Sequence, residues 1–168
     1  QSYRHKIIEA ILSAGIQMHV FGDSWKNYQG DGAWNLIIHP QVIGEEALQV
    51  WQQAKIGLNI MSRHTAGMTE RIANIMLCGA CCLSDETAYL REHFEENREI
   101  VLYKADRLDE LIEKICYLLQ HKERRERIAL NGRNKAVLEH TWHKRAIQLL
   151  ELVEQDTNNG SRQITKIG

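Results

Sequence analysis

The chain has 168 residues, of which 43% are hydrophobic and 26% are charged, a composition typical of one globular domain with a single hydrophobic core. Its net charge of -1 and pI near 6.8 argue against a nucleic-acid-binding surface, which needs a basic excess on one face. No apolar run approaches the roughly 20 residues that span a bilayer, and no signal-peptide pattern opens the chain. We therefore expect a cytoplasmic protein without a membrane span.

Apolar patterns of two kinds, short buried runs and runs with helical spacing, alternate along the chain. They predict strands at residues 16–22, 35–39, 55–60, 80–84 and 98–103. They predict helices at residues 3–14, 44–54 and 69–77, a short helix capped by Ser84 or Asp85, and helices at residues 108–120, 122–138 and 141–155. Strands that alternate with helices indicate an α/β fold with a doubly wound, Rossmann-like parallel sheet flanked by helices.

The two ends of the chain carry separate expectations. A doubly wound domain normally opens on its central strand, whereas this sequence opens on a helix. We expect the chain to be a fragment that lacks its first strand and a partner domain before it, and the uncovered face to favour self-association. We expect residues 1–155 to form the domain and residues 156–168, rich in Asn, Gly and Ser, to form a flexible tail.

The segment from Lys55 to Asp85 carries the strongest functional signal. It contains a buried strand, a polar loop, a helix start, a glycine and a second buried strand. A helix that starts beyond the carboxyl end of a parallel strand offers unpaired N–H groups to a phosphate. The residues of this loop and helix start suit an anion: Ser62, Arg63, His64, Thr65, Gly67, Thr69, Glu70 and Arg71. We interpret the loop as the binding site.

The four cysteines do not predict a metal site. Cys78, Cys81 and Cys82 lie in one apolar stretch, and Cys116 lies within a helical pattern. Zinc sites usually draw paired Cys or His ligands from two places, which this spacing lacks. We expect buried free thiols.

Five segments follow one another in an informative order: YRHKIIEAILSAGIQMHVFGDSW, AKIGLNIM, ERIANIMLCGACCLSDETAYLREHF, EIVLY and NGRNKAVLEHTWHKRA. In this order they resemble the C-terminal half of GT-B glycosyltransferases, closest to the spore-maturation-protein-like (CgeB-type) branch of group 1. The resemblance covers residues 3–154. It implies that this domain holds a nucleotide-sugar donor, such as a UDP- or GDP-sugar, while a separate N-terminal domain holds the acceptor. It also implies sugar transfer without a bound metal or other cofactor.

The resemblance implies a place for the donor on this chain. Gly22 and Asp23 match the glycine-containing turn that lines the donor cleft, and residues 39–43 match the segment that frames the base. Residues 59–65, with Asn59, Ser62 and Thr65, match the loop that faces the sugar and diphosphate. The helix start that meets the phosphates is matched by Thr69, Glu70 and Arg71, and Gly67 lies two residues before it.

Two positions depart from the family pattern. Asn74 stands where many retaining GT-B enzymes have the ribose-binding glutamate of a motif like EAMACG, because the sequence here is NIMLCG. Ala66 stands where the first glutamate of the paired-glutamate motif is usual. An amide can still bond a ribose hydroxyl, but without the charge-assisted bond of a carboxylate.

The chemistry demands positive charge at the departing diphosphate. We expect Arg63 and Arg71 to stabilise it together with Thr69, and His64 to donate a proton or a hydrogen bond. Because the acceptor's general base is expected in the other domain, this chain alone should bind donor and turn over little.

Each assignment has a structural alternative. Arg71 could pair with Glu70 on the helix surface, and His64 could be an ordinary loop hydrogen-bonding group. Asn59 could cap its strand, and Asn74 could be a satisfied buried amide. For the two tryptophans beside the glycine-rich loop, Trp25 and Trp34, packing is the default.

Two other functions remain open at this stage. One is half of a nucleotide-sugar epimerase, whose catalytic carboxylates and histidines we cannot place. The other is a non-catalytic nucleotide-binding or interaction domain of the flavodoxin-like or response-regulator kind. The latter predicts an acidic or flavin-binding loop where this chain has Arg63 and Arg71.

Overall fold

The structure of the chain is a computed structural model that describes residues 2–61 and 66–164. All five strands pair in parallel, which confirms the doubly wound α/β fold. The strands are β1 (Met18–Phe21), β2 (Leu36–His39), β3 (Ile56–Asn59), β4 (Cys81–Asp85) and β5 (Val101–Tyr103). The helices are α1 (Tyr3–Ser13), α2 (Glu45–Gln53), α3 (Glu70–Leu77), α4 (Ala88–His93), α5 (Leu108–Gln120), α6 (Lys122–Glu139) and α7 (Trp142–Ile164).

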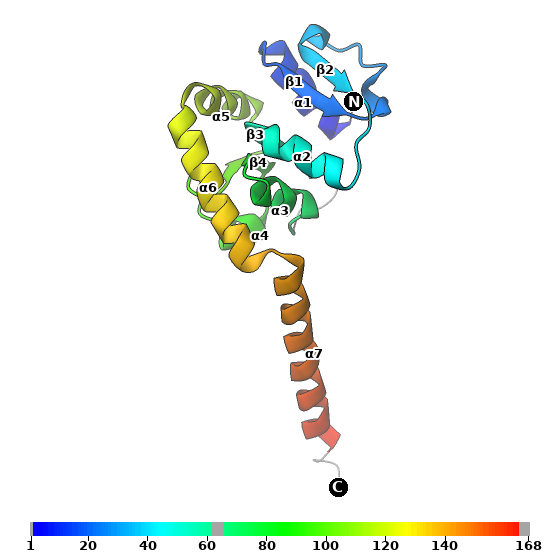
Figure 1. Cartoon of the computed structure of the whole chain (residues 1–168), viewed down its shortest axis with the longest axis vertical. Helices are drawn as coiled ribbons and strands as arrows, with labels where there is room; N and C mark the ends of the chain where they lie inside the picture. The colour runs from blue at the N-terminus through cyan, green and yellow to red at the C-terminus, as the bar shows by residue number, and fades with distance from the viewer. Residues whose placement is uncertain (1, 62–65, 165–168) are drawn as a thin grey trace.

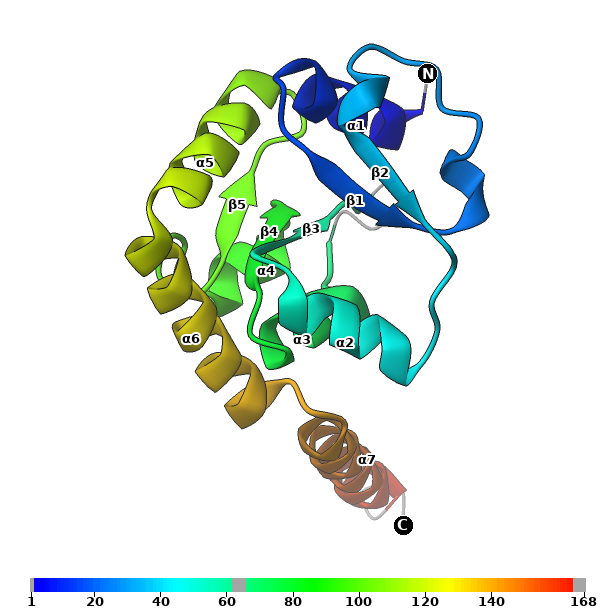
Figure 2. The same cartoon turned by 45° about the horizontal axis from the view of Figure 1, so that its top comes forward.

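The five strands form two sheets rather than one. β1 pairs with β2, and β4 lies between β3 and β5 in the second sheet (Figure 2). Short 3-10 turns at Asp23–Trp25 and Ala33–Asn35 lie in the connection between β1 and β2. The two-stranded sheet therefore lies beside the three-stranded sheet, and no strand pair of the described residues joins them.

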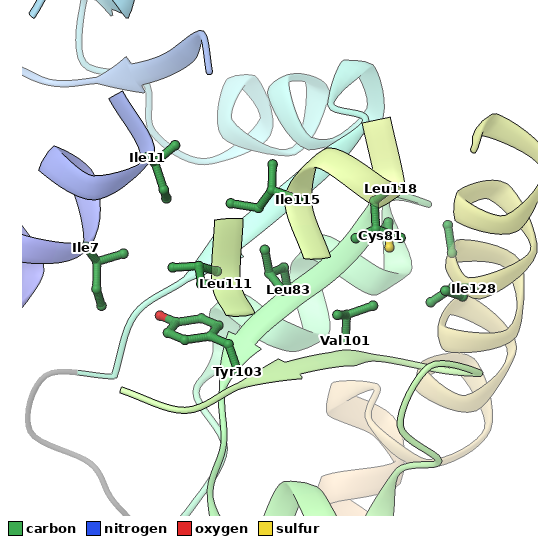
Figure 3. Packing of buried hydrophobic residues seen from close by; sticks show 11 residues of the cluster. Ile7, Ile11, Cys81, Leu83, Val101, Tyr103, Leu111, Ile115, Leu118 and Ile128 are labelled. Carbon is green, nitrogen blue, oxygen red and sulfur yellow. The ribbon is translucent and has the colours of Figure 1, made fainter. Parts of the chain in front are cut away.

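Helix α1 packs against both sheets. Ile7 and Ile11 belong to the cluster that α5 forms with β4 and β5, as Figure 3 shows. Ile8 and Leu12 instead pack with Val20 of β1 and with Trp25. Ile7 and Ile11 form one stripe along α1, and Ile8 and Leu12 form the adjacent stripe. One stripe packs on each sheet, so α1 joins the two sheets.

The three-stranded sheet is covered on both faces. Cys81 and Leu83 of β4 point to the side of α1 and α5, while Cys82 points to the side of α3 and α4. This alternation follows from the two-residue period of a strand. Burial raises the pKa of Cys81 to about 12, so it remains a thiol. All four cysteines are free as predicted, although Cys78 and Cys116 are only half-buried.

Three details differ from the expectations. Asp85 belongs to β4, and the cap of α4 is Thr87, whose hydroxyl accepts a hydrogen bond from the Leu90 amide. An aspartate after an apolar run suits either a strand end or a cap, so the sequence alone does not separate the two. Trp25 packs as expected at 5% exposed, but Trp34 is 84% exposed.

The last helix is longer than the sequence pattern predicts. α7 continues to Ile164, whereas the pattern ends near residue 155, because the polar residues that follow contain no proline to break the helix. It projects away from the rest of the domain and contacts it mainly through α6 (Figure 1). Among the described residues, no helix combines the length and the apolar character that crossing a bilayer requires.

We predict that Gly132→Ala lowers the free energy of unfolding by about 1–3 kcal/mol. A Cβ at this position of α6 would lie 2.4 Å from the backbone oxygen of Glu99, so α6 would have to move. Asn134, an exposed residue of the same helix, provides the control, since Asn134→Ala gains helix propensity without this clash. Equal stabilisation of both variants in urea unfolding would contradict the close approach.

The junction of α6 and α7 contains a buried histidine. Nδ1 of His140 accepts a hydrogen bond from Nη2 of Arg145 at 2.8 Å, so the proton of the neutral ring is on Nε2, which has no partner in the described structure. Burial, followed by the charge of Arg145, lowers the pKa of His140 from 6.5 to about 4.

We predict that stability falls as the pH decreases from about 6.5 to 4, because unfolded His140 binds a proton there and folded His140 does not. The loss should be on the order of 1–3 kcal/mol. His140→Asn keeps an acceptor for Arg145 and should flatten this slope in urea unfolding, whereas His143→Asn at an exposed site should leave it unchanged. The same slope in all three proteins would refute the assignment.

Candidate functional site

Polar residues gather where the three strands of the second sheet end. Asn59, Asp85 and Tyr103 are the last residues of β3, β4 and β5. The strands are parallel and in register, with Asn59 opposite Ser84 and Asp85 opposite Tyr103, so these ends meet at one edge. Ligands of open α/β sheets bind beyond this carboxyl edge.

Asn59 organises the helix start that the sequence predicts to bind phosphate. Its side chain has no exposed surface and donates from Nδ2 to the Ser84 hydroxyl at 3.0 Å. Its Oδ1 accepts from the Thr69 hydroxyl at 3.1 Å and from Nη1 of Arg71 at 3.4 Å. This geometry favours a supporting role for Asn59 over the direct donor contact that we predict from the sequence.

Asp85 joins three parts of the chain. Its two carboxylate oxygens accept from the Met61 amide at 2.9 and 2.8 Å, and Oδ2 also accepts from the Tyr3 hydroxyl at 3.1 Å. Burial raises the pKa of Asp85, while the bond from Met61 opposes the shift. Burial and the charge of Asp85 raise the pKa of Tyr3, so its hydroxyl keeps the proton that it donates.

Two arginines lie in the first turns of the helices that contact this edge. Arg71 lies in the first turn of α3, and Arg4 lies in the first turn of α1, with Cζ 4.9 Å from the centroid of the Trp25 ring. Burial and then the charge of Arg71 lower the pKa of Arg4.

The two arginines lack a counter-charge. No carboxylate forms an ion pair with either of them in the part of the chain that the structure describes. Residues 62–65 have the sequence Ser-Arg-His-Thr, which contains no carboxylate either. Glu70 instead accepts a hydrogen bond from Asn74 at 3.5 Å, so the alternative pairing of Arg71 with Glu70 is not formed. An anion would therefore neutralise an otherwise unpaired cluster.

The start of α3 has no side-chain cap among the described residues. Thr69 is the N-cap residue, but its side chain makes no capping bond, because its hydroxyl is directed to Asn59. The Gly67 carbonyl, just before the helix, accepts from the Thr87 hydroxyl at 2.9 Å, which ties this turn to the start of α4. The positive end of the helix dipole and Arg71 thus lie at the same end of α3.

The remaining predicted residues lie elsewhere or outside the described residues. Gly22 has a φ of 123°, which favours glycine, and Asp23 forms an exposed ion pair with Lys26 at 2.9 Å. Both follow β1, at the carboxyl end of the other sheet. Four predicted residues fall outside the described part of the chain: Ser62, Arg63, His64 and Thr65.

Sequence reasoning missed Arg4, Tyr3 and Asp85. The two α1 residues reach the site only through the packing of α1 against the sheets, so no local pattern marks them. Asp85 had a usable signal, since an aspartate that ends a buried run can lie at the carboxyl edge of a parallel strand. No group of three or more His, Cys, Asp or Glu that could hold a metal ion occurs among residues 2–61 and 66–164.

Solved structures show where this architecture occurs. The C-terminal domain of a group 1 glycosyl transferase, LpcC from Francisella tularensis, superposes with a TM-score of 0.64 at 14% identity, over 84% of this chain and 80% of that one. Anabaena HepE in complex with UDP-glucose superposes with a TM-score of 0.70 at 16% identity, over 92% of this chain and 45% of HepE. Sucrose-phosphate synthase from Thermosynechococcus elongatus superposes with a TM-score of 0.70 at 17% identity, over 93% of this chain and 43% of the synthase.

These likenesses show the fold, which is that of the Rossmann-like C-terminal half of GT-B glycosyltransferases. The chain spans less than half the length of HepE and of sucrose-phosphate synthase. No protein with a curated function matches the chain by sequence. The model of the family described as glycosyl transferase-like matches residues 4–151. The chain therefore belongs to the glycosyl transferase-like family.

Proposed function

We propose that this chain is the donor-binding, C-terminal domain of a glycosyltransferase and that it holds the diphosphate of a nucleotide sugar between α1 and α3. The observation that carries the proposal is the pair of arginines in the first turns of α1 and α3, Arg4 and Arg71, which have no carboxylate partner among the described residues. Planar guanidinium groups bind phosphate oxygens through two parallel bonds, and two of them suit a diphosphate.

The same arrangement would serve the chemistry. When the bond between the sugar and the diphosphate breaks, negative charge grows on the departing oxygens. Arg4, Arg71 and the N–H groups at the start of α3 would stabilise that charge without a metal ion. Arg63 and His64, in the preceding loop, would add a third cation and a hydrogen-bond donor to the leaving group.

The rest of the donor would extend from this point. Asn74 lies one turn after Glu70 on α3, and we propose that its amide contacts the ribose. Gly22, Asp23 and residues 39–43 would line the base and sugar side of the cleft. UDP is the first nucleotide to test, because HepE, which shares the fold, has been solved with UDP-glucose. The acceptor would be held by a separate domain, and the CgeB-type branch remains our prediction.

The alternatives make different demands on the chain. A nucleotide-sugar epimerase domain would need acids or histidines beside the sugar, and a non-catalytic domain would bind a nucleotide without serving a reaction. The uncompensated positive charge at the carboxyl edge favours a diphosphate ligand in all three cases. The glycosyltransferase is preferred because the chain belongs to that family.

We predict that the chain binds UDP, or else GDP or ADP, and that Arg71→Ala weakens the binding about 10- to 150-fold, equivalent to the loss of about 1.5–3 kcal/mol from a charged hydrogen bond. Arg4→Ala should weaken it by a similar factor. Calorimetric titration at low and moderate salt measures both, and higher salt should weaken binding to the wild type more than to either variant.

Arg127 provides the matched control, because it is an exposed arginine of α6 that makes no ion pair in the described structure. Arg127→Ala should bind nucleotide like the wild type. A wild-type chain that binds none of the three diphosphates, or Arg4 and Arg71 variants that bind as well as Arg127→Ala, would refute the proposed site.

A further inference from the structure

We propose that Asp85 is a positioning residue that sets the distance between Arg4 and Arg71 and thereby makes the site selective for a diphosphate over a monophosphate. The inference rests on the proposed function and extends it to residues that touch no ligand. It starts from an unusual feature, a buried carboxylate at the edge of the site that pairs with no arginine among residues 2–61 and 66–164.

A continuous series of hydrogen bonds connects the two arginine-bearing helices. Tyr3, next to Arg4 in α1, donates its hydroxyl proton to Asp85 at 3.1 Å. The Ser84 hydroxyl lies 3.1 Å from the Asp85 carbonyl oxygen and 3.4 Å from Oδ1, and it accepts from Asn59 at 3.0 Å. Asn59 in turn accepts from Arg71 at 3.4 Å. The carboxylate of Asp85 is the step at which α1 joins this series.

The middle of the series is rigid. Asn59 and Ser84 have no exposed surface, and Asp85 is 6% exposed, so their hydrogen bonds cannot be exchanged for bonds to water without unfolding the edge. The bidentate contact with the Met61 amide also fixes the orientation of the carboxylate. A buried network of this kind holds the side chains attached to it in a preorganised geometry.

The network opposes a repulsion. The charge of Arg71 lowers the pKa of Arg4, so the two guanidinium groups repel each other in the absence of an anion. Stacking on Trp25 holds the Arg4 guanidinium, and the Tyr3–Asp85 bond holds the helix turn that carries it. A diphosphate can bond both cations at once, whereas a monophosphate is shorter and gains less from their fixed separation.

The test uses the complete chain with UDP, UMP and inorganic pyrophosphate as probes in calorimetric titrations. Tyr3→Phe removes only the hydroxyl that binds Asp85 and keeps the ring, and Asp85→Asn provides a second variant of the same contact. We expect each to weaken UDP and pyrophosphate binding about five- to ten-fold, equivalent to about 1–1.4 kcal/mol, with UMP binding changed by less than about two-fold.

Tyr117→Phe is the control, since this half-exposed tyrosine lies in α5 away from the site. It should leave the ratio of UDP to UMP affinity unchanged. If wild type binds UDP but Tyr3→Phe and Asp85→Asn keep the wild-type ratio, or weaken UDP and UMP equally, the positioning role is wrong and the donor site stands. If wild type does not bind UDP or pyrophosphate, the proposed function fails and the positioning role fails with it.

Discussion

The buried carboxylate of Asp85 is the contact on which the arrangement of the site depends. A carboxylate in this position needs hydrogen-bond donors, and the donors come from the Met61 amide after β3 and from the Tyr3 hydroxyl of α1. One polar contact therefore aligns α1 with the carboxyl edge of β3 and β4, while Ile7 and Ile11 fix the same helix through the core. Arg4 reaches the edge as a consequence.

The sequence predicts most of the fold because the signals involved are local. The buried runs at β3, β4 and β5 and the helical spacing of α5 are visible without tertiary information, and the helix start at residues 69–71 follows from the polar loop before it. Arg4 and Tyr3 could not be predicted, because they belong to a solvated helix start that meets the site only after α1 packs between two sheets. The role of Asn59 also depends on packing, since burial directs its amide toward Ser84 and Thr69.

The chain belongs to the glycosyl transferase-like family, but neither the family nor the fold identifies a ligand. The ligand has to be inferred from the residues of the site. The solved neighbours share 17% identity or less with the chain in the cases compared, so their ligands do not transfer by likeness alone. Electrostatics favours an anionic ligand, because Arg4 and Arg71 lie in the first turns of α1 and α3 and no carboxylate among the described residues pairs with them. If Asn74 contacts the ribose as we propose, its amide forms a weaker bond than a carboxylate would, so more of the donor affinity should depend on the diphosphate.

The most direct test of this account is an NMR titration of the labelled chain with UDP, recording the backbone amides and the Nε–H groups of the arginines. The account predicts the largest shift changes at the side chains of Arg4 and Arg71 and at the amides of residues 69–71, with little change at the opposite edge of the sheet near Lys55 and Ala80. Saturable changes confined to that opposite edge, or an absence of saturable changes at both arginines, would contradict it.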